Sequence, residues 1–153
     1  MRSLGERIRI LLDTTYLLPI VGIEVEGIEE VLKVLERLYR LGRAEIYYTP
    51  FNMLEIVGKL SRTNYDRRRV RLGLVSIRES FKVTHPTIAG YLRALELRRG
   101  GFRDLIDLLL YETSRTRRLG FLTRDLSLIR FLEEVGEDTA NIVYERDFIQ
   151  KHS

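Results

Sequence analysis

The stretch that most restricts the fold of this chain is Ile8 to Thr15, a short apolar run that stops at a carboxylate followed by two hydroxyls. Such a run predicts a buried strand whose carboxyl end presents Asp13. In open α/β sheets, ligands bind outside the carboxyl ends of the strands, which makes Asp13 a candidate site residue. A lone aspartate after a strand is more often a turn residue or a helix N-cap, so its role depends on the rest of the sequence.

The next two elements complete a βαβ unit. Between residues 27 and 41, apolar side chains recur with helical spacing, with acids in the first turn and arginines near the end, as the helix dipole favours. Gly42 ends this helix, and residues 44–48 predict a second strand. We therefore expect an α/β fold, a three-layer sandwich with a mainly parallel central sheet flanked by helices. The length of 153 residues predicts a single domain, residues 1–153.

The remaining elements follow from periodicity and capping residues. A turn or two of helix is expected from Thr14 to Val21, interrupted by Pro19. Thr49 and Pro50 are typical of a helix start, and that helix runs to about residue 60. Further helices are expected at 64–78, 87–99, 103–118 and 125–135, strands at 120–123 and 141–144, a short strand or loop at 81–84, and a frayed terminal turn at 146–151.

Acidic residues recur where an α/β sandwich would bring them together. The four candidates for catalysis and for metal binding are Asp13, Glu55, Asp107 and Asp125. Carboxylates packed together repel one another, and a divalent cation commonly relieves that repulsion. Oxygen ligands favour Mg²⁺ or Mn²⁺ over zinc, and one or two such ions can activate a water to attack phosphorus. Taken singly, Glu55 also fits an exposed helical residue, and Asp125 also fits a helix cap.

The apolar helix expected at 103–118 carries several polar groups. Helical spacing places a polar stripe on one of its faces, made of Asp104, Asp107, Tyr111 and Ser114. Asp104 is therefore a possible fifth ligand beside Asp107. Thr14 and Thr123 stand next to proposed ligands and could orient a carboxylate or a metal-bound water.

Four short motifs, in chain order, resemble the successive motifs of PIN-domain ribonucleases, among them the VapC-type toxins. They are Leu-Leu-Asp-Thr-Thr at 11–15, Asn-Met-Leu-Glu at 52–55, the segment 107–113, and Leu-Thr-Arg-Asp at 122–125. The resemblance implies an endoribonuclease that depends on Mg²⁺ or Mn²⁺ and uses Asp13, Glu55, Asp107 and Asp125. It also implies a homodimer and, for the toxin of a toxin–antitoxin pair, a small antitoxin partner. The charged run at 114–118 departs from the family's usual pattern.

The balance of charge bears on the substrate. The chain has 26 basic residues, of which 22 are Arg and four are Lys, against 22 acidic ones. Arginine suits phosphate recognition and surface ion-pair networks equally well. When the four proposed ligands are set aside, 18 acids remain, so a positive rim around an acidic cleft would attract RNA. The basic stretch at 62–71 and the cluster Arg115, Arg117 and Arg118 are candidates for that rim, or else solvated faces.

Two alternatives to a free nuclease stay open. The first is a non-catalytic RNA- or protein-binding module on the same fold. The second is a toxin controlled by an inhibitor that docks on the 17–23 loop or on the helix carrying Arg67. His85 and His152 are too scattered to form a site.

The sequence also bears on the compartment. The absence of cysteine excludes disulfides and thiolate zinc sites and fits a reducing cytosol. No apolar segment reaches membrane-spanning length, and residues 1–7 lack the apolar core of a signal peptide. We therefore expect a cytoplasmic protein without a membrane partner.

Overall fold

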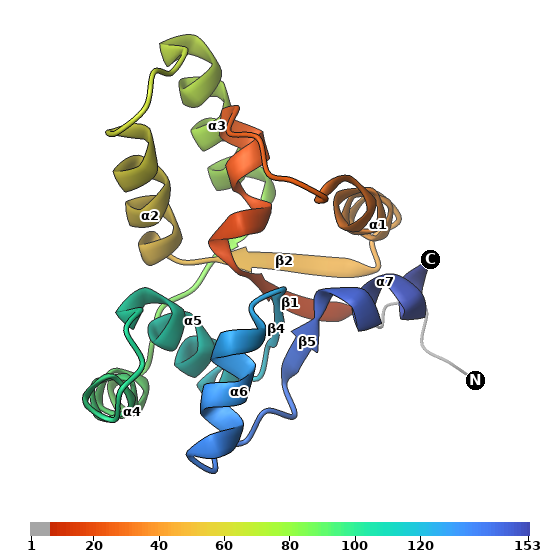
Figure 1. Cartoon of the computed structure of the whole chain (residues 1–153). Coiled ribbons are helices and arrows are strands. Elements are labelled where there is room, and N and C mark those ends of the chain that lie inside the picture. The colour runs from red at the N-terminus through yellow and green to blue at the C-terminus, as the bar shows by residue number, and fades with distance from the viewer. Residues whose placement is uncertain (1–6) are drawn as a thin grey trace.

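The centre of the molecule is a sheet of five parallel strands in the order β3-β2-β1-β4-β5 (Figure 1). This computed structural model describes residues 7–153, so the expected absence of a signal peptide at residues 1–7 lies almost entirely outside the described residues. The strands are β1 (Ile8–Leu12), β2 (Ala44–Tyr48), β3 (Lys82–Val83), β4 (Gly120–Thr123) and β5 (Ile142–Tyr144). Every neighbouring pair is parallel, which confirms the expected sheet.

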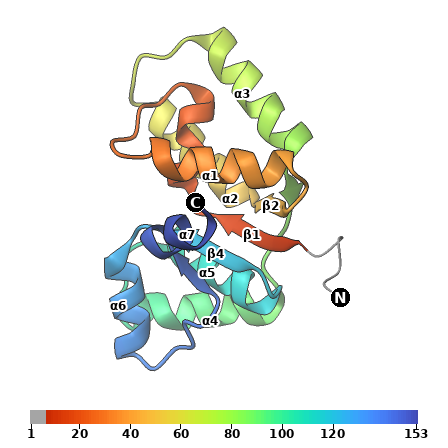
Figure 2. The same cartoon turned by 90° about the vertical axis from the view of Figure 1, so that its right-hand side faces the viewer.

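Helices cover both faces of this sheet (Figures 1 and 2). The α-helices are α1 (Glu29–Arg40), α2 (Pro50–Leu60), α3 (Arg67–Ser80), α4 (Ile88–Arg99), α5 (Leu105–Thr116), α6 (Leu126–Glu134) and α7 (Glu145–His152). The helices α1, α2 and α3 lie on one side, and α4, α5 and α6 lie on the other. The expected three-layer α/β sandwich is therefore confirmed.

The core is divided into two parts by the central strand. Successive side chains of a strand point to opposite faces, so Ile10 and Leu12 pack on the side of α1 while Leu11 packs on the side of α5. All three are almost fully buried. A strand buried on both faces needs a continuous apolar run, which is why the sequence does not alternate here.

Several local expectations were wrong or incomplete. The terminal segment is not a frayed turn but the helix α7, because Phe148 is buried in the core and anchors it. Pro19 does not break a helix; it stands in the first turn of the second of two 3₁₀ helices, η1 (Thr14–Tyr16) and η2 (Leu18–Val21), where its missing N–H is not needed. The helix expected from residue 64 begins at Arg67, since Asp66 caps it. In residues 7–153 no helix is both long and apolar enough to span a bilayer.

Candidate active site

All five candidate acids line one pocket of about 290 Å³ at the carboxyl edge of the sheet. Asp13 follows β1 and Asp125 follows β4, and these two strands are parallel neighbours. Glu55 comes from α2, which follows the adjacent strand β2. Asp104 and Asp107 stand at the start of α5. Because parallel neighbours end at the same edge of a sheet, residues far apart in the sequence meet there.

Asp13 is held in place by its neighbours. The Thr123 hydroxyl donates to its Oδ2 at 2.8 Å, and the backbone N–H of Thr15 donates to its Oδ1 at 3.5 Å. The side chain is nearly buried, and this burial raises the pKa of Asp13 above its ordinary value. Thr123 therefore orients a carboxylate, which is one of the two roles expected for it.

Glu55 is fixed by a chain of hydrogen bonds that the sequence analysis missed. The Thr14 hydroxyl donates to Glu55 Oε1, and Asn52 Nδ2 donates to Thr14 Oγ1 at 2.9 Å and to the Leu12 carbonyl at 3.1 Å. Asn52 is completely buried, and its Oδ1 accepts from the backbone N–H of Thr49 at 2.7 Å. The capping box formed by Thr49 and Asn52 is the signal that could have revealed it.

Carboxylate oxygens of Glu55, Asp104 and Asp107 lie within 4.8 Å of one another. Asp104 is the N-cap of α5 and accepts from the backbone N–H of Asp107 at 3.1 Å. Burial, followed by the charges of Asp13, Asp104, Glu55 and Asp125, raises the pKa of Asp107 to about 9. Burial also raises the pKa of Glu55. Asp104 and Asp107 both line the pocket.

This donor set fits a hard divalent cation. Three carboxylates this close offer only oxygen ligands, and their crowded negative charge is what such a cation would neutralise. Asp13 and Asp125 line the same pocket but do not belong to the tight group of three. Asp125 also caps α6, with its Oδ1 accepting from the N–H groups of Ser127 and Leu128 at 3.0 and 3.2 Å. Asp125 therefore caps α6 and lines the pocket at the same time.

Two members of the polar stripe on α5 make their hydrogen bonds away from the pocket. Tyr111 is completely buried and donates its hydroxyl to the Asp138 carbonyl at 2.6 Å. Ser114 is also buried, and its hydroxyl accepts from Asn141 at 2.8 Å. Because α5 is enclosed on most sides, these groups tie it to the segment before β5 and do not reach the pocket.

Several arginines of this half of the molecule are engaged by partners within the chain. Arg124 lines the pocket, but its guanidinium donates to both oxygens of Glu145, at 2.9 and 3.0 Å. Arg115 pairs with the buried Glu112 at 2.7 Å, and Arg117 donates to the His85 carbonyl. The cluster of Arg115, Arg117 and Arg118 begins about 12 Å along α5 from Asp107. Lys59 is the remaining cationic residue that lines the pocket in residues 7–153.

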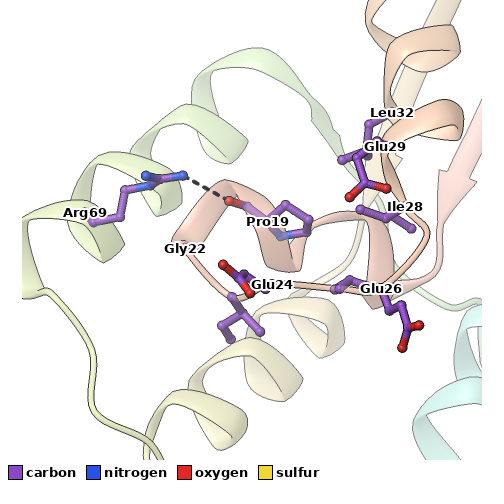
Figure 3. A pocket seen from close by; sticks show the side chains of 10 residues that line it. Pro19, Gly22, Glu24, Glu26, Ile28, Glu29, Leu32 and Arg69 are labelled. Atoms are coloured by element: carbon purple, nitrogen blue, oxygen red, sulfur yellow. Dashed lines mark hydrogen bonds between the residues drawn. The ribbon is translucent and has the colours of Figure 1, made fainter.

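A larger pocket of about 830 Å³ lies elsewhere, between η2, the start of α1 and α3 (Figure 3). Its acids Glu24, Glu26 and Glu29 do not form a cluster suited to a metal. In residues 7–153 the only group of three acids with ligand oxygens within 4.8 Å of one another is Glu55, Asp104 and Asp107. Arg69 of α3 donates to the Pro19 carbonyl at 3.2 Å across its edge. The smaller acidic pocket is therefore the candidate active site.

The comparisons with known proteins agree with this geometry. The sequence model of the PIN domain matches residues 10–133. The chain belongs to the PIN-domain family. The resemblance drawn from the four motifs is thus confirmed, and the match spans every acid of the pocket.

Solved structures show the same fold at low sequence identity. VapBC2 from Rickettsia felis, bound to a DNA fragment from its promoter, is similar with a TM-score of 0.64 and 13% identity, covering 90% of this chain and 97% of that chain. VapC20 from Mycobacterium tuberculosis, a sarcin-ricin-loop-cleaving toxin, has a TM-score of 0.58 and 15% identity, covering 86% of this chain and 98% of that chain. FitAcB from Neisseria gonorrhoeae has a TM-score of 0.54 and 16% identity, covering 81% of this chain and 93% of that chain. No curated protein matches the sequence. Family and fold together support nuclease activity in general.

Proposed function

We propose that this PIN-domain protein is an endoribonuclease that depends on Mg²⁺ or Mn²⁺ and acts in the cytoplasm. The observation that carries the proposal is the group of three carboxylates with oxygens within 4.8 Å, in one pocket with Asp13 and Asp125. A sequence without cysteine fits a reducing compartment. The fold shared with a toxin that cleaves the sarcin-ricin loop supports RNA as the substrate class.

In this proposal Glu55, Asp104 and Asp107 hold the cation, with Asp13 and Asp125 completing its surroundings. When bound, a divalent cation lowers the pKa of a water and neutralises charge on the phosphate. The protein's own contribution is to fix the ligands before the substrate arrives. Thr123 orients Asp13, and Thr14 orients Glu55. Such positioning reduces the rearrangement needed to reach the transition state.

The experiment that tests the proposal is incubation of the purified protein with total RNA. We expect cleavage with Mn²⁺ or Mg²⁺ and none with excess EDTA, with activity restored when the metal is returned. Binding of RNA without cleavage under all three conditions would favour the alternative, a non-catalytic RNA-binding module. Cleavage that persists in EDTA would contradict the metal requirement.

RNA is expected to contact the start of α3. The arginines of this region are exposed, and none of them pairs with an acid in residues 7–153: Arg62, Arg67, Arg68, Arg69 and Arg71. Lys59, the residue before the last one of α2, lines the pocket itself. Exposed arginines without an acidic partner are suited to holding the phosphates of a bound RNA.

Replacing Arg67 and Arg68 together with glutamine is therefore expected to weaken RNA binding. For single-stranded RNA, each lost phosphate contact reduces the magnitude of the slope of log K against log salt by roughly 0.7. The slope of the double variant should therefore be smaller in magnitude by about 1.4. Binding is measured in EDTA at several salt concentrations. The matched control is Arg98→Gln with Arg99→Gln, an exposed adjacent pair at the end of α4, on the other side of the sheet. Equal losses in both double variants would remove this role for α3.

A second candidate role is that of a toxin controlled by a small antitoxin. The two docking segments expected from the sequence are the 17–23 loop and the Arg67 helix, and they pack against each other. Gly73 of α3 packs so closely on η2 that a side chain there would clash with the Ile20 carbonyl. Arg69 spans from α3 to Pro19 beside the 830 Å³ pocket (Figure 3). The fold shared with VapBC2 of Rickettsia felis supports such a partner.

A further inference from the structure

Two cationic residues line the acidic pocket, Lys59 and Arg124. The Arg124 guanidinium donates to both carboxylate oxygens of Glu145 and to the backbone carbonyls of residues 26 and 27. Its charge and most of its N–H groups are therefore engaged within the chain. Lys59 is exposed and forms no ion pair with an acid of residues 7–153. Its ammonium is therefore available to a ligand that enters the pocket.

Lys59 stands one helical turn beyond Glu55 on α2. Residues four apart lie on the same face of a helix, about 6 Å apart along its axis. Burial is the main influence on the pKa of Glu55 and raises it, whereas the charge of Lys59 acts in the opposite direction. The carboxylate of Glu55 is oriented by the Thr14 hydroxyl and not by Lys59. Lys59 therefore acts on the pocket through its charge without holding a metal ligand in place.

The charge of the pocket opposes the entry of a polyanion. Five carboxylates line the pocket, and when all of them are ionised their negative charge exceeds what one divalent cation neutralises. Because Arg124 is balanced by Glu145, it does little to offset this excess. A phosphate that enters the pocket therefore needs a further positive charge, and Lys59 is the residue of the lining that can supply it.

We propose that Lys59 contacts the RNA phosphate in the metal pocket and is a further catalytic residue of this site. The inference rests on the proposed function, because it assigns a substrate contact within the same pocket. An ammonium group offers three donors, and its hydrogen bonds to phosphate oxygens are strengthened by charge. Lys59 would offset negative charge that develops on the phosphate during attack by water, and it would keep its own proton throughout.

The position of Lys59 also fits the basic surface at the start of α3. Figure 1 shows that the end of α2 and the start of α3 both lie at the end of these helices that points away from the sheet. Along the chain, Lys59 stands between Glu55 of the pocket and Arg62 of the basic stretch. An RNA strand held by the arginines of α3 would therefore pass the end of α2 and meet Lys59 as it reaches the acids.

The first test is the binding of a short single-stranded RNA of mixed sequence, with Ca²⁺ in place of Mn²⁺ and at several salt concentrations. Lys59→Gln should reduce the magnitude of the slope of log K against log salt by roughly 0.7, because one phosphate contact is lost. Lys59→Arg keeps the charge and should keep the slope. The matched control is Lys33→Gln on α1, an exposed lysine outside the pocket that forms no ion pair in residues 7–153.

The second test is RNA cleavage in Mn²⁺. Lys59→Gln should lower kcat/KM by roughly 10–100-fold, less than the loss of a buried donor, because solvent and salt screen an exposed charge. Lys59→Arg should restore most of the activity, and Lys33→Gln should match the wild type. Circular dichroism of each variant checks that it folds.

The binding of Mn²⁺ without RNA separates contact with substrate from a structural role. A basic residue in the last turn of a helix interacts favourably with the helix dipole, and Lys59 is in the last turn of α2. We expect Lys59→Gln to bind Mn²⁺ at least as tightly as the wild type, since an ammonium near the site repels a cation. Weaker Mn²⁺ binding, measured by isothermal titration calorimetry, would show that Lys59 supports the metal ligands and would overturn the inference.

This inference and the proposed nuclease fail on different results. If Lys59→Gln equals the wild type in both salt slope and cleavage rate, the contact with phosphate is wrong and the nuclease stands. If the wild type binds RNA but does not cleave it with any metal, the nuclease is wrong. A smaller salt slope in Lys59→Gln would then still support the contact between Lys59 and an RNA phosphate.

Discussion

Replacing Asp13 with asparagine is expected to abolish RNA cleavage while preserving the fold. Asp13 is the acid nearest the centre of the sheet edge, and its carboxylate is oriented by Thr123. Loss of its charge removes several kcal/mol of transition-state stabilisation in a metal-dependent site, which corresponds to roughly 10²–10⁴-fold in rate. The measurement is initial rate of RNA cleavage at saturating Mn²⁺.

The fold should survive this substitution for two reasons. Asparagine is as good an N-cap as aspartate, so η1 keeps its cap. Burial already raises the pKa of Asp13, so a neutral side chain is easily accommodated. The same substitution at Asp147, an exposed acid in the first turn of α7, is the control and should leave cleavage unchanged. A fully active, folded Asp13→Asn protein would falsify the proposed site.

The metal-free protein is expected to lose stability as pH rises from about 4 to about 9. The pKa of Asp107 is raised from 3.8 to about 9, so the folded state binds this proton more tightly than the unfolded state. The stability that protonated Asp107 contributes is fully present below about pH 4 and is lost as the pH rises through about 9. Asp13 and Glu55 act in the same direction, since burial raises the pKa of each. The measurement is melting temperature in EDTA between pH 5 and pH 8.5.

Asp107→Asn isolates the contribution of this group. It should raise the melting temperature in EDTA at pH 8 by several degrees. In a chain of this size, each kcal/mol gained in the free energy of unfolding raises the melting temperature by about 2–4 °C. It should also flatten the pH dependence. Mn²⁺ should stabilise the wild type and have less effect on the variant, because one ligand is lost. If the variant follows the pH profile of the wild type, the crowded acids do not control stability.

Much of the fold could be read from the sequence because strands and helices leave local signals. The apolar run at 8–12 needed only its neighbours in sequence to be recognised as a buried strand. Asp13 was found because it directly follows β1, and Asp125 because it comes two residues after the end of β4. The carboxyl ends of parallel strands share an edge. The helix after Thr49 and Pro50 was equally clear from its cap.

The tertiary structure decided which polar groups face one another. Helical spacing could not separate Asp107, which reaches the pocket, from Tyr111 and Ser114, which are buried against the segment before β5. Nor could it show that Asn52 donates a hydrogen bond to Thr14, whose hydroxyl in turn donates to Glu55. The reason is physical: spacing fixes the direction of a side chain around its own helix axis, whereas the neighbour that it meets depends on how separate elements pack. The sequence by itself therefore determined the strands, most of the helices and the acids at their ends, and only the packed molecule determined which of those acids share a single charge environment.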